Sequence, residues 1–584
     1  MNDVIETDVL IVGGGGAACR AAIAAHDAGA DVLVILKGKL GHSGCTRYVG
    51  TNAAVGPWGD QNDTPESAMR DLLAHGGFLG NQELVKILTE ESAARIEELA
   101  GWGVDFERDE DGSIAIMHAA AHTYGRNLTL KPNDPDLQDD GYLPGIALMD
   151  ALMAQMEKRR IRVMNDVALV DLLSTDGRIV GATAIDCQAN KIIAFKAGST
   201  ILATGTYSHV YSRASVALEE TGDGQAAAFR AGVELIDMEN AQFIPSWTGI
   251  PPGSVPVNAL GEPFLERYGV TSLETKTKED VVFAIGTEIR EGRGTERGTI
   301  FIDTSGPENA DTEKMPFPPR YQKNLRNDGS LYPGYMGESV DLSAGRFETG
   351  PLAHTATGGI RINAQCEASV PGLYAAGGVV GGIYGHARPE GFTVMITLVF
   401  GRRAGLYAAR AAKAAGEVEL AVDAVEASRD RAARVAGRLG DEGLKDLRTA
   451  IAATMTESAW VIKDEAGLRR GLEQIRELAE GERRRTAGPA AEGGPVDGFA
   501  WNKALEVPNL LLCAEMLLMG AIERKESRGA FFRADYPKTD NERWLKNITH
   551  RQVDGWTVMD TVPVDLRYCG PESLPAVDPK ELSR

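Results

Sequence analysis

Residues 8–37 read DVLIVGGGGAACRAAIAAHDAGADVLVILK, and this stretch decides the fold class. The apolar run at 9–12 predicts a short buried strand, the glycines at 13–16 a turn, and the alanine-rich segment at 17–28 a helix. The β-branched run at 31–36 then predicts a second buried strand. Because the order is strand, glycine turn, helix and strand, it indicates a βαβ unit with parallel strands and therefore an α/β fold.

The glycine turn predicts a binding site for the diphosphate of a dinucleotide. Gly13 and Gly15 fit the pattern G-x-G-x-x-[G/A], with Ala18 in the third place, where a small residue lets helix and strand pack closely. Free N–H groups and the helix dipole both favour negative charge at this helix N-terminus. An ordinary α/β turn with spare glycines would look the same, but the position between two strands favours the dinucleotide.

One element of the dinucleotide pattern is missing. An acidic residue near the end of the second strand would bind the adenosine ribose, but that position is Leu36, followed by Lys37 and Gly38. We therefore expect a weaker ribose contact beside an intact diphosphate site.

The composition excludes several classes of protein. The 584 residues include 61 Lys and Arg against 83 Asp and Glu, and a net charge of −22 disfavours nucleic acid as a partner. Six scattered cysteines without a C-x-x-C pair argue against a zinc site, an iron–sulfur cluster or a disulfide scaffold in this chain. Uninterrupted apolar runs fall short of the roughly 18 residues of a membrane helix, and the first residues lack the basic region of a signal peptide. We expect a cytoplasmic enzyme with no membrane span and no metal site.

Further along the chain, a further strand and glycine turn precede a segment of different composition. Residues 197–205 (AGSTILATG) predict another buried strand, and TGDG at 221–224 opens an alanine-rich helix. Asp223 in that turn is either a helix N-cap or a ribose ligand. Residues 240–345 are Pro-rich with one helical segment at 278–292, which indicates an inserted domain.

After the inserted domain the first pattern resumes. A strand is expected at 372–377 and a helix at 391–410. From about 415 to about 530 the composition turns to Ala, Glu, Arg and Leu with helical periodicity, interrupted by a loop at 486–495.

Taken together, these landmarks resemble the flavoprotein subunits of succinate dehydrogenase and fumarate reductase, and their relatives L-aspartate oxidase and the α chain of adenylylsulfate reductase. The matching stretches are VLIVGGGGAACRAA (9–22), STILATG (199–205), TGDG (221–224), ME-x-x-QF-x-P (238–245), EIREGRG (288–294), H-x-x-x-GGI (354–360), GLYAAGG (372–378), VFGRRAG (399–405) and ESRGAFFRADYPKTDNERWLKN (526–547). They follow one another at the spacing of the family.

The resemblance implies an α/β fold with a discontinuous Rossmann-like FAD-binding domain, an inserted α+β capping domain and a C-terminal helical domain. The expected bounds are 1–239 and 346–414 for the FAD-binding domain, 240–345 for the capping domain, 415–547 for the helical domain and 548–584 for a C-terminal extension.

The resemblance also assigns residues to FAD. Those expected at the diphosphate, the ribityl side, the adenosine half and the flavin's carbonyl edge are Gly13, Gly15, Gly16, Ala17, Lys37, Ser43, Gly44, Thr46, Gly50, Ala203, Thr204, Gly205, Asp223, Gly377, Thr393 and Val394. A glutamate of the family falls on Gly378, which is a second missing ribose contact beside Leu36.

In relatives that attach FAD covalently, a histidine precedes the Gly-rich turn. Aligned from Gly50, that position falls on Ser43, with His42 one residue earlier. A one-residue slip swings a side chain to the opposite face, so we expect FAD to be bound non-covalently. His42 is then either a flavin contact or a surface loop residue.

The substrate site departs from the pattern of fumarate and succinate enzymes, in which two histidines, a threonine and two arginines clamp the carboxylates. One histidine position is Ile244, the following loop is shortened to WTGIPPGS (247–254), and the arginine that transfers a proton falls near Ile250. An apolar residue cannot relay a proton, and each lost charge-assisted contact costs about 1.5–3 kcal/mol. We therefore expect a substrate other than plain fumarate or succinate.

The remaining candidates for catalysis flank the flavin. The resemblance keeps His354 and Arg388, and Tyr384 and His386 lie in the same segment as Arg388. A histidine can act as an acid or base near neutral pH, and an arginine can anchor an anion. Each lone histidine could equally be a hydrogen-bonded structural residue. Arg346 is the substitute proton relay in this hypothesis.

Two further clusters have less specific patterns. HAAAHTYGR (118–126) places two histidines four residues apart, but no third ligand follows at metal spacing, so a substrate contact or a surface loop is favoured. Arg290 and Arg293 are expected to form structural ion pairs.

Three functions are compatible with these features. The first is an FAD-dependent oxidoreductase that transfers hydride between a small organic substrate and flavin and exchanges electrons with a separate, ferredoxin-like iron–sulfur subunit. The second is a flavoprotein that resembles adenylylsulfate reductase, suggested by Gly385-His386. The third is a catalytically silent structural subunit, in which the missing contacts would reflect decay.

Overall fold

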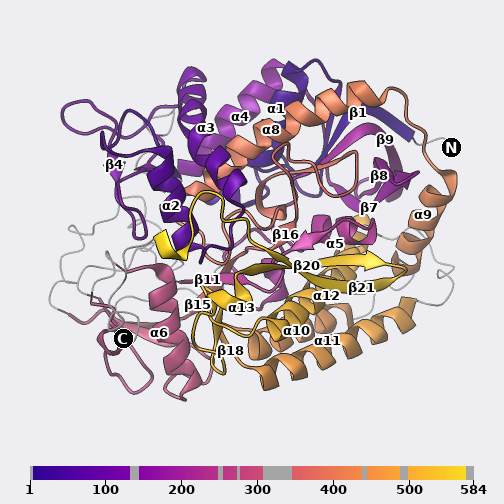
Figure 1. The fold of residues 1–584 in the computed structure, drawn as a ribbon. Coiled ribbons are helices and arrows are strands. Elements are labelled where there is room, and N and C mark those ends of the chain that lie inside the picture. The colour runs from indigo at the N-terminus through magenta and orange to yellow at the C-terminus, as the bar shows by residue number, and fades with distance from the viewer. Residues whose placement is uncertain are drawn as a thin grey trace.

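The computed structural model describes residues 4–131, 144–246, 254–271, 276–306, 345–436, 443–486 and 497–573. Its centre is a seven-stranded sheet in the order β6-β2-β1-β9-β8-β7, with β17 beside β9 (Figure 1). The strands are β1 (Val4–Val12), β2 (Val32–Leu36), β6 (Arg162–Asn165), β7 (Val167–Thr175), β8 (Arg178–Asp186), β9 (Lys191–Leu202) and β17 (Leu373–Ala375). Since β1 pairs in parallel with both β2 and β9, the predicted βαβ unit is confirmed.

Two helices from distant parts of the sequence cover the parallel strands. Helix α1 (Gly16–Asp27) follows the glycine turn, and α8 (Phe392–Ala415) packs against it (Figure 1). Their backbones approach closely because small residues line the contact: a Cβ built on Gly405 would lie 2.1 Å from the carbonyl oxygen of Ala21. The chain therefore returns to the first sheet after the insertion, as the sequence predicts.

The insertion forms a smaller α+β part together with β14 (Arg346–Thr349) and β15 (Pro351–Ala356), which follow its expected end at residue 345 but pair with its strands. Its other described elements are β11 (Ala241–Pro245), β12 (Val255–Val257), α6 (Lys278–Arg290) and β13 (Ile300–Asp303). Strand β11 pairs with β15, and β12, β13 and β14 form a second sheet. Figure 1 shows α6 at the lower left, away from α1 and α8 at the top, so this part borders the sheet from another side.

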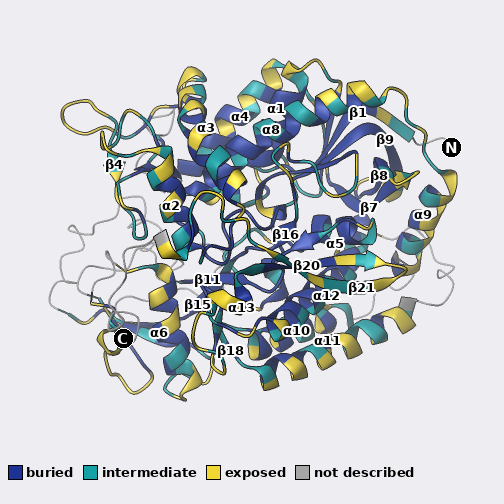
Figure 2. Cartoon of the chain, viewed as in Figure 1, coloured by how far each residue is buried: buried dark blue, intermediate teal, exposed yellow. Residues whose placement is uncertain are grey.

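The C-terminal region is mostly helical. It contains α9 (Val422–Ala436), α10 (Gly443–Ser458), α11 (Glu465–Thr486) and α12 (Gly498–Glu523). Helix α12 is long and apolar enough to cross a membrane, but 72% of its most apolar window is buried inside the protein (Figure 2). It packs against α5, α9, α10 and α11, so it is the core helix of this region.

Shorter elements complete the described chain. They are β3 (Asn52–Ala53), α2 (Pro65–His75), α3 (Gln82–Gly101), β4 (Ile116–Met117), β5 (Asn127–Leu128), α4 (Pro144–Lys158), α5 (Asp223–Arg230), β10 (Leu235–Ile236), β16 (Gly359–Ile360), β18 (Ile462–Lys463), β19 (Phe532–Arg533), α13 (Asn541–Trp544), β20 (Lys546–Val553) and β21 (Trp556–Pro563). Strand β20 pairs with β10, so the C-terminal segment joins a four-stranded sheet with a strand that precedes the insertion.

The close contact of α1 and α8 generates the first prediction. Gly405→Ala should destabilise the protein by several kcal/mol, about the size of an overpacked core substitution or more, because the new methyl group meets backbone. Gly481→Ala is the matched control: Gly481 is exposed in α11 with no neighbouring atom within 4 Å, so alanine should add about 0.5–1 kcal/mol of stability. Urea unfolding of both variants measures the difference, and equal midpoints would contradict the packing argument.

Candidate active site

A cavity of about 860 Å³ opens where the parallel strands of the main sheet end. Gly13 follows β1, Ala203 follows β9, and both line it, as do Gly391 and Thr393 at the start of α8. The carboxyl ends of parallel strands are the usual place for a ligand in α/β proteins. The cavity is also bordered by the first turn of α6 and by β15, so the insertion closes one of its sides.

The glycine turn brings bare backbone to the cavity wall. Gly13 has φ of +130°, and a Cβ built on it would lie 2.2 Å from the carbonyl oxygen of Ala203. The N–H of Gly16 donates to Oγ1 of Thr46 at 3.1 Å, which ties the start of α1 to the segment that follows β2. A side chain at Gly13 would therefore separate the two strand ends on which the cavity depends.

Every residue assigned to FAD from the sequence lines this one cavity. The set comprises Gly13, Gly15, Gly16, Ala17, Lys37, Ser43, Gly44, Thr46, Gly50, Ala203, Thr204, Gly205, Asp223, Gly377, Thr393 and Val394. These residues come from six separate stretches of the chain, and only the folded sheet brings them together.

Lys37 and Asp223 lie together at one end of the cavity. Lys37 Nζ is 2.6 Å from Asp223 Oδ2, 2.7 Å from Thr221 Oγ1 and 3.0 Å from Glu506 Oε1. Burial would raise the pKa of Asp223, but the charge of Lys37 outweighs it and the pKa lies below its usual value. Asp223 is thus an ionised carboxylate at the first position of α5, where Asn509 also donates to it at 2.9 Å.

His354 is aimed into the cavity by a β-bulge. In the pairing of β11 with β15, Gln242 lies opposite Thr355 and Phe243 opposite Ala353, so His354 is the extra residue. Its Nδ1 is 2.6 Å from the hydroxyl of Ser215. Burial lowers the pKa of His354 well below its usual value, and the charges of Arg388 and Lys278 lower it further, so the ring is neutral at pH 7.

Arg388 is the second predicted catalytic residue that lines the cavity. One of its nitrogens donates to the hydroxyl of Thr393 in the first turn of α8, whereas Nε is buried and has no partner among the described residues. Burial lowers the pKa of Arg388, although an arginine keeps its charge at neutral pH. A guanidinium with a free nitrogen is suited to bind an anion.

The other three predicted catalytic residues do not line the cavity, which corrects the sequence-based assignment. Tyr384 is buried beside Arg388, and His386 is fully buried. Arg346 is exposed on β14, with its guanidinium 4.6 Å from the centre of the Phe301 ring. Since β14 pairs with β13, Arg346 packs on Phe301 and is not among the described residues that line the cavity, so the structure gives its predicted role as a proton relay no support.

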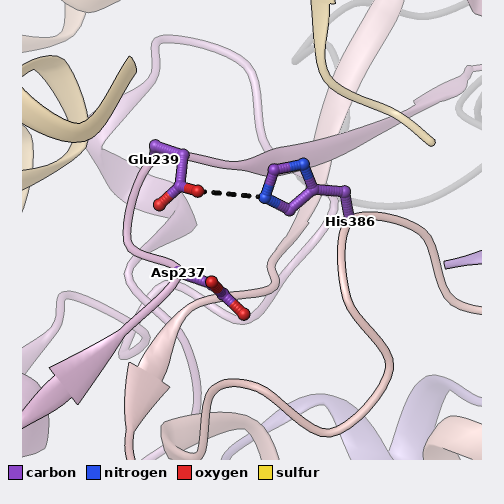
Figure 3. A group of neighbouring side chains, drawn as sticks. All are labelled: Asp237, Glu239 and His386. Atoms are coloured by element: carbon purple, nitrogen blue, oxygen red, sulfur yellow. Dashed lines mark hydrogen bonds and ion pairs between the residues drawn. The ribbon is translucent and has the colours of Figure 1, made fainter. Parts of the chain in front are cut away.

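His386 instead belongs to a buried polar cluster with Asp237 and Glu239 (Figure 3). His386 Nε2 is 3.1 Å from Glu239 Oε1, and Arg524 Nε donates to the same oxygen at 2.9 Å. Asn547 donates to both carboxylate oxygens of Asp237. Three possible metal ligands meet here, but the guanidinium already neutralises Glu239, so the cluster is an ion-pair network.

The two carboxyl groups of this network differ in their protonation. Burial and the neighbouring charge of Glu239 raise the pKa of Asp237 to about 8. Burial would also raise the pKa of Glu239, but Arg524 and His386 lower it below its usual value. Asp237 therefore keeps a proton that Glu239 has lost.

The substrate side of the cavity is only partly described. Ile244, which replaces a histidine of the family pattern, does line the cavity, so an apolar group stands there. The position near Ile250 that would correspond to the proton-transferring arginine lies outside the described residues.

Several polar residues of the cavity were not predicted from the sequence, among them His75, Gln242 as a contact, and Glu279. Gln242 Nε2 donates to Glu279 Oε1, and His75 Nε2 lies 3.5 Å from Glu279 Oε2. Glu279 lies within the polar helix start TKTKED (275–280), and its pattern predicts only an exposed first turn. An acid among other charged and polar residues at the N-terminus of α6 gave no signal that it would face a cavity.

Two other sequence hypotheses have clear outcomes. His118 lines the cavity, while His122 is buried between Phe392 and Arg126, with Nε2 3.2 Å from the carbonyl oxygen of Glu390. Arg290 pairs with Asp464 at 2.7 Å and Arg293 with Glu288 at 2.7 Å, which confirms their predicted structural ion pairs.

The comparisons with known proteins agree with this architecture. Residues 8–394 match the family described as FAD binding domain, and residues 448–581 match fumarate reductase flavoprotein C-term. The chain is 31% identical to one subunit of the fumarate reductase (CoM/CoB) of Methanothermobacter marburgensis, over 94% of this chain and 97% of that protein. It therefore belongs to the family of FAD-dependent oxidoreductases that includes the fumarate reductase and succinate dehydrogenase flavoproteins.

Solved structures show the same fold. An E. coli quinol fumarate reductase superposes with a TM-score of 0.83 at 25% identity, covering 99% of each chain. Adenylylsulfate reductase from Archaeoglobus fulgidus superposes with a TM-score of 0.74 at 19% identity, covering 96% of each chain, which shows the fold alone.

The cavity fits FAD, the cofactor of this family. The glycine turn gives a diphosphate a wall of N–H groups, and the hydroxyl of Thr204 and Oδ1 of Asn127 are buried at the cavity without a partner in the described part of the chain. The acid missing at Leu36 has a counterpart nearby: a Cβ built on Gly38 would lie 3.4 Å from Oε1 of Glu219. FAD would be held by residues of both halves of the discontinuous domain.

The raised pKa of Asp237 gives a prediction about stability. The folded protein retains this proton between the usual pKa of an Asp and about 8, whereas the unfolded chain loses it, so the contribution of Asp237 to stability declines as pH rises. Asp237→Asn cannot titrate, so its free energy of unfolding should fall less steeply than that of the wild type. Urea unfolding between about pH 5 and about pH 8 measures the two slopes, which differ by at most about 1.4 kcal/mol per pH unit. Parallel slopes would contradict the assignment of the proton to Asp237.

Proposed function

We propose that the protein is an FAD-dependent dehydrogenase or reductase that acts on a small organic anion other than plain fumarate or succinate. The observation that supports this is the pair of Arg388 and His354 at the cavity, beside an apolar Ile244. FAD, when bound, accepts or supplies a hydride. Arg388 would bind one carboxylate or carbonyl oxygen, and neutral His354, fixed by Ser215, would hydrogen-bond the same end of the substrate.

The charges of the cavity favour one anionic group over two. Arg388 has a free nitrogen, but the acid Glu279 lies near it, and Lys278 is paired with Glu390 at 3.0 Å. A second carboxylate near Glu279 would face another carboxyl group, and near Ile244 it would lose its hydration without a partner. A substrate with a single carboxylate and an apolar or neutral remainder suits these walls best.

We further propose a separate iron–sulfur protein as the electron partner. The similar protein from M. marburgensis is named as one subunit of an enzyme, and this chain has six cysteines that are free and dispersed, four of them buried. Two-electron chemistry at FAD needs an outlet for electrons that such dispersed thiols cannot provide. We place this assembly in the cytoplasm.

The two alternatives receive less support. An adenylylsulfate reductase activity was suggested by His386, but this residue is bound in the ion-pair network away from the cavity. A silent subunit would be expected to fill its cofactor site with side chains, whereas this cavity is open and retains unpartnered polar atoms.

Non-covalent attachment of FAD is the first prediction from this proposal. Ser43 lines the cavity and accepts a hydrogen bond from the backbone N–H of Lys39 at 2.9 Å, whereas His42 is exposed and does not line it. Acid precipitation of the purified protein should release all of its yellow FAD into the supernatant. His42→Ala should bind as much FAD as the wild type. Flavin that stays with the precipitate would show a covalent bond.

The second prediction concerns Arg388. Under anaerobic conditions, a screen of organic acids should identify a compound that bleaches or restores the flavin spectrum. Arg388→Ala should bind FAD but lose about 10- to 10²-fold of kcat/KM for that compound, because a charge-assisted hydrogen bond of about 1.5–3 kcal/mol is lost and its site stays buried. Arg346→Ala, which removes an exposed guanidinium outside the cavity, is the matched control and should retain full activity. Unchanged activity of the Arg388 variant would remove this residue from the mechanism.

A further inference from the structure

Glu279 and His75 form a pair of titratable side chains in the cavity wall. Glu279, in the first turn of α6, is only 7% exposed, and His75 is the last residue of α2. One carboxylate oxygen of Glu279 accepts a hydrogen bond from Gln242 Nε2, and the other lies 3.5 Å from His75 Nε2. An amide thus fixes the carboxyl group while its second oxygen is directed toward a histidine.

Gln242 also places this pair next to the proposed substrate anchor. The same Nε2 lies 3.3 Å from the backbone oxygen of Arg388, so a single amide joins the Glu279 carboxylate to the segment that holds the guanidinium. The cofactor-binding turn and α8 reach the cavity from the main sheet, whereas α6 reaches it from the insertion (Figure 1). A substrate anchored at Arg388 would therefore have flavin on one side and Glu279 within reach on another.

Two other titratable side chains near Arg388, His354 and Glu390, have competing partners. His354 is held neutral and bound through Nδ1 to Ser215. The Glu390 carboxylate is 44% exposed and paired with Lys278. Glu279 combines burial with a neighbour that can exchange a proton: the His75 side chain retains 11% exposure.

We propose that Glu279 is the catalytic residue that exchanges a proton with the substrate carbon, and that His75 exchanges this proton with solvent. This inference rests on the proposed function. Reduction of a carbon–carbon double bond adds a hydride to one carbon and a proton to the other. The O–H bond of the Glu279 carboxylic acid breaks as the new C–H bond forms, which leaves a carboxylate. His75 Nε2 then returns a proton to it, and oxidation of the product uses the same atoms in reverse.

The experiment compares two carboxylates of the same cavity, in the holoenzyme with the compound found by the flavin screen. Glu279→Gln should keep the shape of the side chain and lower kcat by about 10²- to 10⁴-fold, the usual contribution of a general acid or base. Its FAD content, and its affinity for the reaction product read from the visible flavin spectrum, should change less than about threefold. Glu390→Gln, which releases Lys278 on the cavity rim, is expected to shift KM but to keep kcat within about threefold of the wild type.

Chemical rescue separates proton transfer from a structural role. Added formate should restore part of the turnover of Glu279→Ala, because a small acid can occupy the space of the missing carboxyl group. His75→Gln should slow steady-state turnover more than a single turnover, since only reprotonation of Glu279 is impaired. Weakened product binding in Glu279→Gln without rescue by formate would overturn the proposal. If the wild-type flavin reacts with no organic acid, the proposed function fails instead, whatever the variants do.

Discussion

The structure depends on the close approach of bare backbone at the ends of β1 and β9. Gly13 and Ala203 are near enough that no side chain fits between them, and this contact fixes both walls of the cofactor cavity. A second close backbone contact of this kind lies between the two helices that cover the sheet, where Gly405 of α8 meets Ala21 of α1. Because α8 begins at the cavity, its packing against α1 sets the position of Thr393 and, through it, of Arg388. The positions of the cofactor site and of Arg388 therefore both depend on glycines, whose lack of a side chain lets backbone segments approach closely.

A second constraint acts from the opposite end of the chain. The segment that holds Arg388 is anchored through His386: its N–H donates to Gly76 at 3.1 Å, its carbonyl oxygen accepts from Asn240 at 2.7 Å, and its ring meets Glu239. Arg524 from the helical region completes this anchor. A histidine that resembles a catalytic group in the sequence thus serves to hold a loop. The C-terminal region, which also contacts the cavity residues Lys37 and Asp223 through Glu506 and Asn509, contributes to the position of Arg388 by closing this buried network.

The sequence predicted the main features of the fold because they have local causes. A glycine turn between β-branched runs and alanine-rich helices determines β1, α1 and β2, and the FAD-lining residues follow from the motifs around Gly13, Ser43 and Thr393. The catalytic residues were predicted less well. His354 and His386 look alike in sequence, but a bulge turns His354 into the cavity, whereas His386 is bound by Glu239, which is itself paired with Arg524 from another region. No local pattern contains this information, because it depends on pairing between distant strands.

Glu279 illustrates the same limit and its physical origin. At the start of a helix with a capping box formed by Thr277 and Asp280, an acid is expected for local reasons, since negative charge near a helix N-terminus is favourable. Only the approach of Gln242 on β11 makes this acid part of a cavity wall. The insertion and the main sheet must therefore be correctly placed relative to each other before Arg388 and Glu279 can face one substrate. A chemical step that uses both residues would therefore depend on the position of the insertion, because substrate binding at Arg388 and proton transfer at Glu279 both require the two parts to face one cavity.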